Sequence, residues 1–249
     1  MDIQKVIQIA KEAGEKILHI YENEDFSSTV DFKADDSPLT IADKASHVII
    51  AKGLEEYFPE IPVLSEEGRS IDFAERKAWS TFWCVDPLDG TKEFIKKNGQ
   101  FTVNIALIKD GYPVLGVIYT PVTGECYYSD GSKSYLEVGG ETKLLKINNS
   151  VENRVAVRSA SHAADEEDVL LSKYKVTDAI SVGSSLKFCM VASGKADIYY
   201  RHGPTMEWDT AAGQAVLEGA GGKVQRLSGE RFYYNKENLL NESFLCLGF

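Results

Sequence analysis

The sequence predicts two halves of different fold class, an α+β half over residues 1–150 and an α/β half over residues 151–249. Three observations support this prediction. Two helical patterns open the chain, closely spaced strand patterns follow them, and strand and helix patterns alternate after the polar stretch 148–153. Runs of strands beside helices are typical of α+β units, whereas regular alternation is typical of α/β units.

The first half begins with two predicted helices. Apolar residues recur at helical spacing from Ile3 to Leu18 and form one stripe. A second helix is predicted to begin after Thr40 and to run to about residue 58, where Pro59 ends it. The polar stretch 31–37 between the two helices is predicted to be a loop or a short hairpin.

Strand patterns follow the helices. The aromatic and β-branched run 79–85 predicts a buried strand that ends at Asp86-Pro87. Further runs predict an antiparallel meander, in which Lys109-Asp110-Gly111 makes the first hairpin turn. These runs cover residues 102–108, 114–119, 125–129 and 134–138.

The second half alternates between strands and helices. Strands are predicted over residues 155–157 and 196–200, and helices over residues 163–171, 184–193 and 209–218. Gly219 and the pair Gly221-Gly222 are expected to end the last of these helices, because glycine readily adopts the left-handed conformation found after helix ends.

The composition narrows the class of protein. The chain has 249 residues, 43% of them hydrophobic, which is enough for a substantial core. A net charge of -11 disfavours binding to a nucleic-acid polymer. The four cysteines show neither metal-ligand nor disulfide spacing, so we expect small buried side chains and a reduced, cytoplasmic setting. We find neither a signal-peptide pattern nor an apolar run of 18 residues that would predict an integral membrane segment.

The segment Asp86-Pro87-Leu88-Asp89-Gly90-Thr91 carries the strongest chemical signal. It brings two carboxylates, three residues apart, to the end of a predicted buried strand. Both could reach one hard cation or two adjacent ones, with the carbonyl of Leu88 as a further oxygen ligand. The helix expected from Thr91 would offer backbone amides to a phosphate. Asp-Pro and Asp-Gly are also ordinary turn formers, so the segment alone leaves both interpretations open.

Two other acidic segments indicate a metal site only when they are considered together with this one. Glu66 and Glu67 follow a short apolar strand, and adjacent residues on a strand point to opposite sides. We therefore expect one of them to face a metal and the other to support it, although a solvated loop is the common alternative. Asp209 lies where a helix N-cap would, and capping is the alternative explanation of its presence.

Taken together, Ser65-Glu66-Glu67, the stretch 86–94 (DPLDGTKEF) and the stretch 208–213 (WDTAAG) resemble the lithium-sensitive, metal-dependent phosphatases that include inositol monophosphatase. The stretches 33–43 and 183–189 are similar to the branch of 3'(2'),5'-bisphosphate nucleotidases. The resemblance covers nearly the whole chain, and it implies a layered α/β/α/β/α sandwich.

The resemblance also implies a role for each matching residue. One Mg²⁺ would be bound by the carboxylates of Glu66 and Asp86 and by the Leu88 carbonyl. Another would be bound by the carboxylates of Asp86, Asp89 and Asp209. Two or three Mg²⁺ ions are expected in all, with inhibition by Li⁺. Asp43 and Thr91 would activate the attacking water. The backbone amides of Gly90 and Thr91 would bind the phosphate, and Glu67 would support the metal site.

Substrate contacts are expected in the second half. The residues that match the nucleotidase branch are Ser161, His162, Ser184, Lys187 and Arg201, together with Asp209. A second phosphate on the substrate needs a nearby cation, which Lys187 and Arg201 would supply. Each of the two could instead be a solvated surface residue, and His162 a loop histidine.

The predicted function is therefore removal of the 3'-phosphate of adenosine 3',5'-bisphosphate, and of its sulfated relative 3'-phosphoadenylyl sulfate, by Mg²⁺-activated water. Inositol monophosphatase activity is the alternative within the same chemistry. A binding module for metal or nucleotide without turnover is the alternative from another class. A monomer is favoured over a homodimer, and the resemblance alone adds a peripheral association with the inner membrane.

Overall fold

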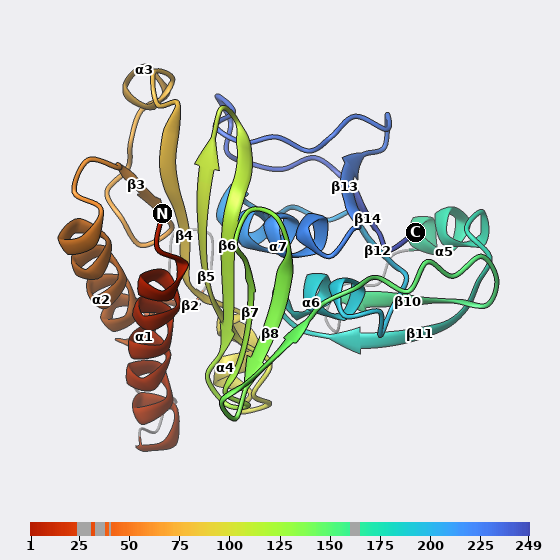
Figure 1. The fold of residues 1–249 in the computed structure, drawn as a ribbon, viewed down its shortest axis with the longest axis horizontal. Helices are drawn as coiled ribbons and strands as arrows, with labels where there is room; N and C mark the ends of the chain where they lie inside the picture. Colours follow the sequence, from red (N-terminus) through yellow and green to blue (C-terminus); the bar gives the residue numbers. More distant parts are fainter. Residues whose placement is uncertain (24–30, 33–37, 40, 160–164) are drawn as a thin grey trace.

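The computed structural model describes residues 1–23, 31–32, 38–39, 41–159 and 165–249 (Figure 1). In these residues, helices and two β-sheets stack in the order helix, sheet, helix, sheet, helix. Two large apolar cores and one smaller core fill the spaces between the layers. The layered sandwich that the sequence predicts is confirmed.

The first sheet has seven strands in the order β3-β4-β5-β6-β7-β8-β9, antiparallel except for the parallel pair of β3 and β4. Phe82 and Cys84 of β4 face the second sheet, whereas Trp83 and Val85 face α1 and α2, because side chains alternate along a strand. The bounds are β3 (Val63–Ser65), β4 (Thr81–Asp89), β5 (Thr102–Lys109), β6 (Tyr112–Thr120), β7 (Glu125–Ser129), β8 (Ser134–Val138) and β9 (Glu141–Leu144).

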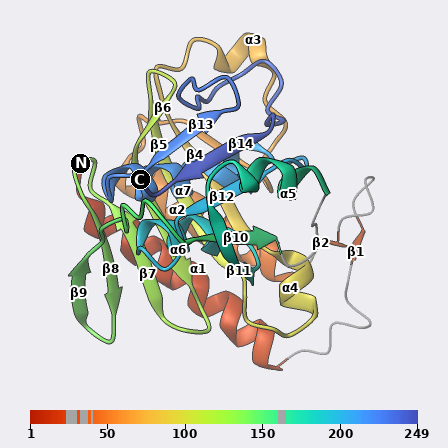
Figure 2. The same ribbon diagram turned by 90° about the vertical axis from the view of Figure 1, so that its right-hand side faces the viewer.

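Helices α1 (Ile3–Asn23) and α2 (Ile41–Tyr57) cover the outer face of this sheet (Figure 1). The buried side of α1 contains the predicted apolar stripe, and α2 ends just before Pro59 as expected. Between them, β1 (Asp31–Phe32) and β2 (Pro38–Leu39) pair antiparallel and lie at one edge of the molecule in Figure 2. Residues 33–37 lie outside the described residues.

The second sheet has five strands in the order β11-β10-β12-β14-β13. Strand β10 is parallel to β11 and β12, while β14 is antiparallel to β12 and β13. Helix α5 (Asp165–Ser172) packs Leu171 against the outer face of this sheet. The bounds are β10 (Arg154–Ser159), β11 (Val176–Val182), β12 (Ile198–Arg201), β13 (Lys223–Arg226) and β14 (Phe244–Leu247).

Helices α6 (Leu186–Ala192) and α7 (Glu207–Gly219) form the layer between the sheets (Figure 1). Small residues permit this close packing. A Cβ on Gly116 of β6 would lie 2.7 Å from the Cβ of Ala215, and one on Gly213 would lie 2.3 Å from the ring of Phe188. Helix α7 can therefore rest directly on the first sheet, which brings its first turn toward the end of β4.

Several element bounds differ from the prediction. Strand β4 continues past Asp86 to Asp89, because the ladder with β5 resumes at the pair Asp89–Thr102 after an irregularity. Helix α6 begins at Leu186, since Ser184 has a φ of 44°, which a right-handed helix does not accommodate. The sequence analysis missed the strands β9, β11, β13 and β14 and the short helices α3 (Phe73–Arg76) and α4 (Thr91–Ile95), apart from the start of α4 at Thr91.

The four cysteines are all buried and unbridged, as predicted. No helix in the described part of the chain is both long enough and apolar enough to cross a bilayer. The proposed division near residue 150 falls between the two sheets, but one apolar core includes residues of both halves. The division into two subdomains therefore stays a prediction.

Candidate active site

The end of β4 forms a buried corner. Asp86 is only 1% exposed, and its Oδ1 accepts a 3.0 Å hydrogen bond from the amide of Leu88. The carbonyl of Pro87 accepts a 2.7 Å bond from the hydroxyl of Ser46, which ties the corner to α2. Because both bonds fix the backbone directly after Asp86, its carboxylate has a defined direction.

Gly90 completes the corner. Its φ of +93° belongs to the left-handed region, which glycine adopts without strain. A Cβ at this position would also lie 3.0 Å from the carbonyl oxygen of Gln100. Gly90 is therefore required by conformation and by space, and α4 begins directly after it at Thr91.

Asp209 reaches the corner from the second half of the chain. It stands at the third position of α7, since Met206 is the N-cap, so the expected N-cap position for Asp209 is wrong by three residues. Its Oδ2 accepts a 2.8 Å hydrogen bond from the amide of Met206 and so still serves the helix end. Capping and a ligand role are therefore compatible, because the carboxylate has a second oxygen.

The first turn of α7 is fixed by a buried ion pair. Glu207 is fully buried, and its carboxylate lies 2.6 Å from the ammonium nitrogen of Lys236. The same carboxylate accepts bonds from the amides of Asn235 and Lys236. Arg76 of α3 holds this loop from the other side, through bonds to the Asn235 side chain and the Lys236 and Glu237 carbonyls. These contacts hold the backbone at Glu207 in place, and therefore also the position of Asp209 two residues later.

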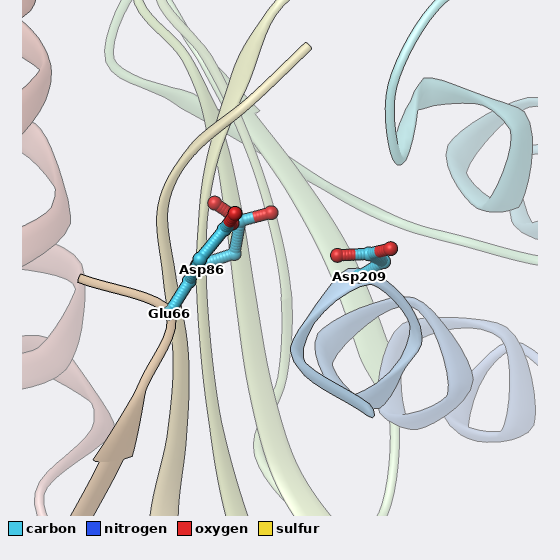
Figure 3. A group of neighbouring side chains, drawn as sticks. All are labelled: Glu66, Asp86 and Asp209. Atoms are coloured by element: carbon cyan, nitrogen blue, oxygen red, sulfur yellow. The ribbon is translucent and has the colours of Figure 1, made fainter. Parts of the chain in front are cut away.

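Glu66, Asp86 and Asp209 form the acidic cluster (Figure 3). One carboxylate oxygen from each lies within 4.8 Å of the others. Figure 3 shows Glu66 and Asp86 side by side at the ends of β3 and β4, with Asp209 opposite them at the start of α7. Carboxylates from three distant segments thus converge on one point, which is a donor set suited to a hard divalent cation.

Burial and mutual repulsion make this cluster costly without a cation. Burial raises the pKa of Asp86 well above its ordinary value, and the charges of Glu66 and Asp89 raise it further. Burial also raises the pKa of Asp209 well above its ordinary value, helped by Asp89. A cation among these oxygens would remove both the repulsion and the need to hold protons, so the residues fit a metal site.

Asp43 and Thr91 meet beside the corner. Asp43 is 2% exposed on α2, and the hydroxyl of Thr91 lies 3.5 Å from its Oδ2 and 3.4 Å from the carbonyl oxygen of Leu88. The structure thus brings the two residues expected to activate water next to the expected carbonyl ligand. Burial lowers the pKa of His47, and the negative charge of Glu67 opposes this shift.

A pocket opens next to the acidic cluster. Its wall includes Asp89, Gly90, Lys92, Ser184, Lys187, Arg201 and Asp209. Lys187 is only 7% exposed and donates a 2.6 Å bond to the carbonyl of Ser184. Burial lowers the pKa of Lys187 to about 8, although the negative charge of Asp89 opposes this shift. A solvated helix lysine is therefore the wrong description of Lys187.

Arg201 stands on the same wall at the end of β12. Its guanidinium donates to the carbonyls of Gly203 and Pro204, which fix its position. Arg201 and Lys187, together with Lys92, thus line the pocket that adjoins the carboxylates. Ser161 and His162, the other expected substrate contacts, lie outside the described residues.

Sequence reasoning missed Ser185 and Asn104. The hydroxyl of Ser185 lies 2.8 Å from Oδ2 of Asp89, and Asn104 of β5 donates a 2.9 Å bond to that hydroxyl. Both side chains are buried. A serine at a helix start suggests a cap, so its sequence position gave no sign of this contact.

Comparison with known proteins agrees with the fold and the site. The sequence model described as the inositol monophosphatase family matches residues 2–245. A 3'(2'),5'-bisphosphate nucleotidase CysQ of Salmonella typhimurium is 44% identical over 245 residues, which covers 97% of this chain and 98% of the relative. CysQ of Escherichia coli K12 is 44% identical over 243 residues, with the same coverage of both chains.

Solved structures give the same result. The crystal structure of CysQ from Bacteroides thetaiotaomicron superposes with a TM-score of 0.87 at 44% identity, covering 98% of this chain and 96% of that one. A Thermotoga maritima IMPase superposes with a TM-score of 0.80 at 22% identity, covering 99% and 91%, and supports the fold alone.

Fold and acidic cluster together define a phosphatase-type site, and the chain belongs to the inositol monophosphatase family. Mg²⁺ dependence is general in this family, and the acidic cluster offers oxygens of the kind that Mg²⁺ requires.

In the metal-free protein, the contribution of Asp86 and Asp209 to stability should fall as the pH rises above about 4. The ordinary pKa of an aspartate is 3.8, and the folded pKa values of Asp86 and Asp209 lie well above it. Between the unfolded and folded pKa values the native state holds more protons, so the free energy of unfolding falls with rising pH. Asp86→Asn removes one such group, so its free energy of unfolding should fall less than that of wild type as the pH rises.

Urea unfolding in EDTA between pH 5 and pH 8 measures the free energies of unfolding of wild type and Asp86→Asn. Asp110→Asn is the matched control, because Asp110 lies exposed in the β5–β6 turn, where its φ of 51° also suits asparagine. Parallel stability curves for wild type and Asp86→Asn would contradict the predicted strain in the acidic cluster.

Proposed function

We propose that this protein is a Mg²⁺-dependent 3'(2'),5'-bisphosphate nucleotidase that converts adenosine 3',5'-bisphosphate to AMP and phosphate. One observation carries the proposal: the acidic cluster adjoins a pocket whose wall includes the cations Lys187 and Arg201, beside Lys92. A monoester with a single phosphate has no second anionic group for these cations to bind. A substrate with a second phosphate also needs positive charge at a distance from the reacting centre.

The relatives support the same substrate class. Proteins named 3'(2'),5'-bisphosphate nucleotidase CysQ are 44% identical over nearly the whole chain in Salmonella typhimurium and Escherichia coli. We extend the proposal to 3'-phosphoadenylyl sulfate, which carries the same 3'-phosphate next to an anionic 5' group. That 5' group would meet the same two cations.

The acidic cluster, Asp89 and the Leu88 carbonyl would together hold two Mg²⁺ ions. Bound Mg²⁺ supplies charge neutralisation and makes water more acidic. Asp43 and Thr91 would orient the attacking water, and the Asp43 carboxylate would take its proton. Their separation of 3.5 Å supports this pairing, since it leaves both oxygens able to contact one water.

The remaining parts of the corner would hold the phosphate. Gly90 and Thr91 stand at the start of α4, where backbone amides have no partner within the helix. Such amides bind phosphate oxygens well. Lys187 and Arg201 would fix the other end of the nucleotide, so that the 3'-phosphate faces Asp43 and Thr91.

Turnover tests this function directly. Wild type should release phosphate from adenosine 3',5'-bisphosphate in Mg²⁺ much faster than from inositol 1-phosphate, and Li⁺ should inhibit the release. Asp86→Ala should remain folded but lose roughly a thousandfold or more in kcat, because it removes a carboxylate of the proposed metal site.

Each alternative has its own outcome in that experiment. Faster release from inositol 1-phosphate would assign the inositol ester as the substrate and leave the metal chemistry in place. No release from either compound by the folded wild-type protein would indicate a binding module. A near-normal kcat for Asp86→Ala would contradict the assignment of the acidic cluster.

Arg201→Met tests the contact with the second phosphate. The variant should raise the KM for adenosine 3',5'-bisphosphate by about tenfold to a hundredfold, since a hydrogen bond to a charged group contributes about 1.5–3 kcal/mol. For adenosine 3'-monophosphate, which lacks the second phosphate, the KM should change little. Arg231→Met is the matched control, because Arg231 pairs with Glu218 away from the pocket. Equal changes in KM for both nucleotides would contradict the assigned contact.

A further inference from the structure

The hydroxyl of Ser185 connects carboxylate residues from the two halves of the chain. Its Oγ lies 2.8 Å from Oδ2 of Asp89, at the end of the first sheet, and 3.0 Å from the backbone carbonyl oxygen of Asp209, in α7. Ser185 is only 2% exposed. One buried side chain therefore sets the separation between two residues proposed to bind the same cation.

Ser185 makes these contacts in place of the capping hydrogen bond that is usual for a serine at its position. It occupies the N-cap position of α6, where a serine side chain usually accepts a bond from the first turn of its own helix. Its side chain makes no such capping bond. Loss of a cap costs about 1 kcal/mol, and local rules of this kind are most often broken at functional sites.

Two neighbours on β5 set the direction of the Ser185 hydroxyl. Thr102 donates a 3.0 Å bond to Oδ1 of Asn104, which turns the amide nitrogen of Asn104 toward Ser185. That nitrogen donates a 2.9 Å bond to Ser185 Oγ. Because the serine oxygen accepts there, its hydrogen points toward Asp89 and the Asp209 carbonyl. Thr102 and Asn104 are buried as well, so water does not compete.

Both donors reach the same oxygen of Asp89. Ser185 Oγ lies 2.8 Å and Asn104 Nδ2 lies 3.4 Å from Oδ2. The carboxylate is thereby oriented so that Oδ1 can serve a cation.

We propose that Ser185, held by Asn104, is a positioning residue that aligns Asp89 with Asp209 for cation binding. The proposal rests on the metal-dependent function proposed above. It assigns Ser185 no contact with the substrate or the reacting phosphate. Groups that orient metal ligands typically contribute tenfold to a hundredfold in metal affinity or activity.

Ser185→Ala tests the proposal through Mg²⁺ affinity measured by calorimetry without substrate. The Kd for Mg²⁺ should rise by about tenfold to a hundredfold. In turnover assays, kcat should return close to the wild-type value when Mg²⁺ is raised to saturation, and the KM for the nucleotide should then be unchanged.

The same helix offers a matched control. Ser193 lies at the other end of α6 and donates to the carbonyl of Cys189, away from the carboxylates. Ser193→Ala should leave the Kd for Mg²⁺ unchanged. Ser185→Thr retains the hydroxyl and should restore most of the affinity that Ser185→Ala loses.

Asn104→Leu provides a second variant of similar side-chain volume that leaves residue 185 a serine and removes the bond which Asn104 donates to it. It should weaken Mg²⁺ binding in the same direction by a smaller factor, and combined with Ser185→Ala it should add little, since the two side chains act as one unit. Wild-type affinity in folded Ser185→Ala, or in Asn104→Leu if the former fails to fold, would overturn the positioning role while the proposed function stands. A folded wild type that binds no Mg²⁺ would overturn both.

Discussion

Mutual repulsion among closely spaced carboxylates is the constraint on which the site depends. Glu66, Asp86 and Asp209 bring oxygens within 4.8 Å of one another at a place where Asp86 is almost inaccessible to water. Burial and like charges at this separation raise the pKa values of Asp86 and Asp209, and protons or a cation offset the repulsion. The surrounding structure therefore has to hold these side chains where they would not stay by themselves.

The layered fold holds these side chains in place from two directions. Strand β4 places Asp86 in the site, because hydrogen bonds from Ser46 to Pro87 and from the Leu88 amide to Asp86 fix the backbone there. Helix α7 arrives from the opposite side, and its first turn is held by the buried pair of Glu207 and Lys236. Close packing of α7 on the first sheet, which needs glycine at position 116, sets the distance between the two sides.

Much of the fold and of the candidate site could be predicted from the sequence. The helix stripe, the meander and the corner at residues 86–91 have local signals, because periodicity and turn chemistry are written in neighbouring residues. The short or exposed strands β9 and β11 have no such signal, since pairing with a neighbouring strand defines them. Convergence of Glu66 and Asp209 on Asp86 followed from the family resemblance and not from spacing.

Ser185 and Asn104 show where sequence reasoning ends. Each has an ordinary local explanation, a helix cap for the serine and a strand residue for the asparagine. Their contact with Asp89 arises only when α6 is packed against β5, and no pattern in a single sequence records that packing. The exact start of α7 is a similar case, because Asp209 can satisfy the helix end from its third position.

Proton release on Mg²⁺ binding tests most directly whether a cation replaces protons in the acidic cluster. Calorimetric titrations of metal-free wild type with Mg²⁺ near pH 6, repeated in buffers of different ionisation enthalpy, count the protons released. Net release is predicted, and it should diminish as the pH rises past the folded pKa values of Asp86 and Asp209, because the metal then finds carboxylates already ionised. A binding enthalpy independent of the buffer at every pH would contradict the account.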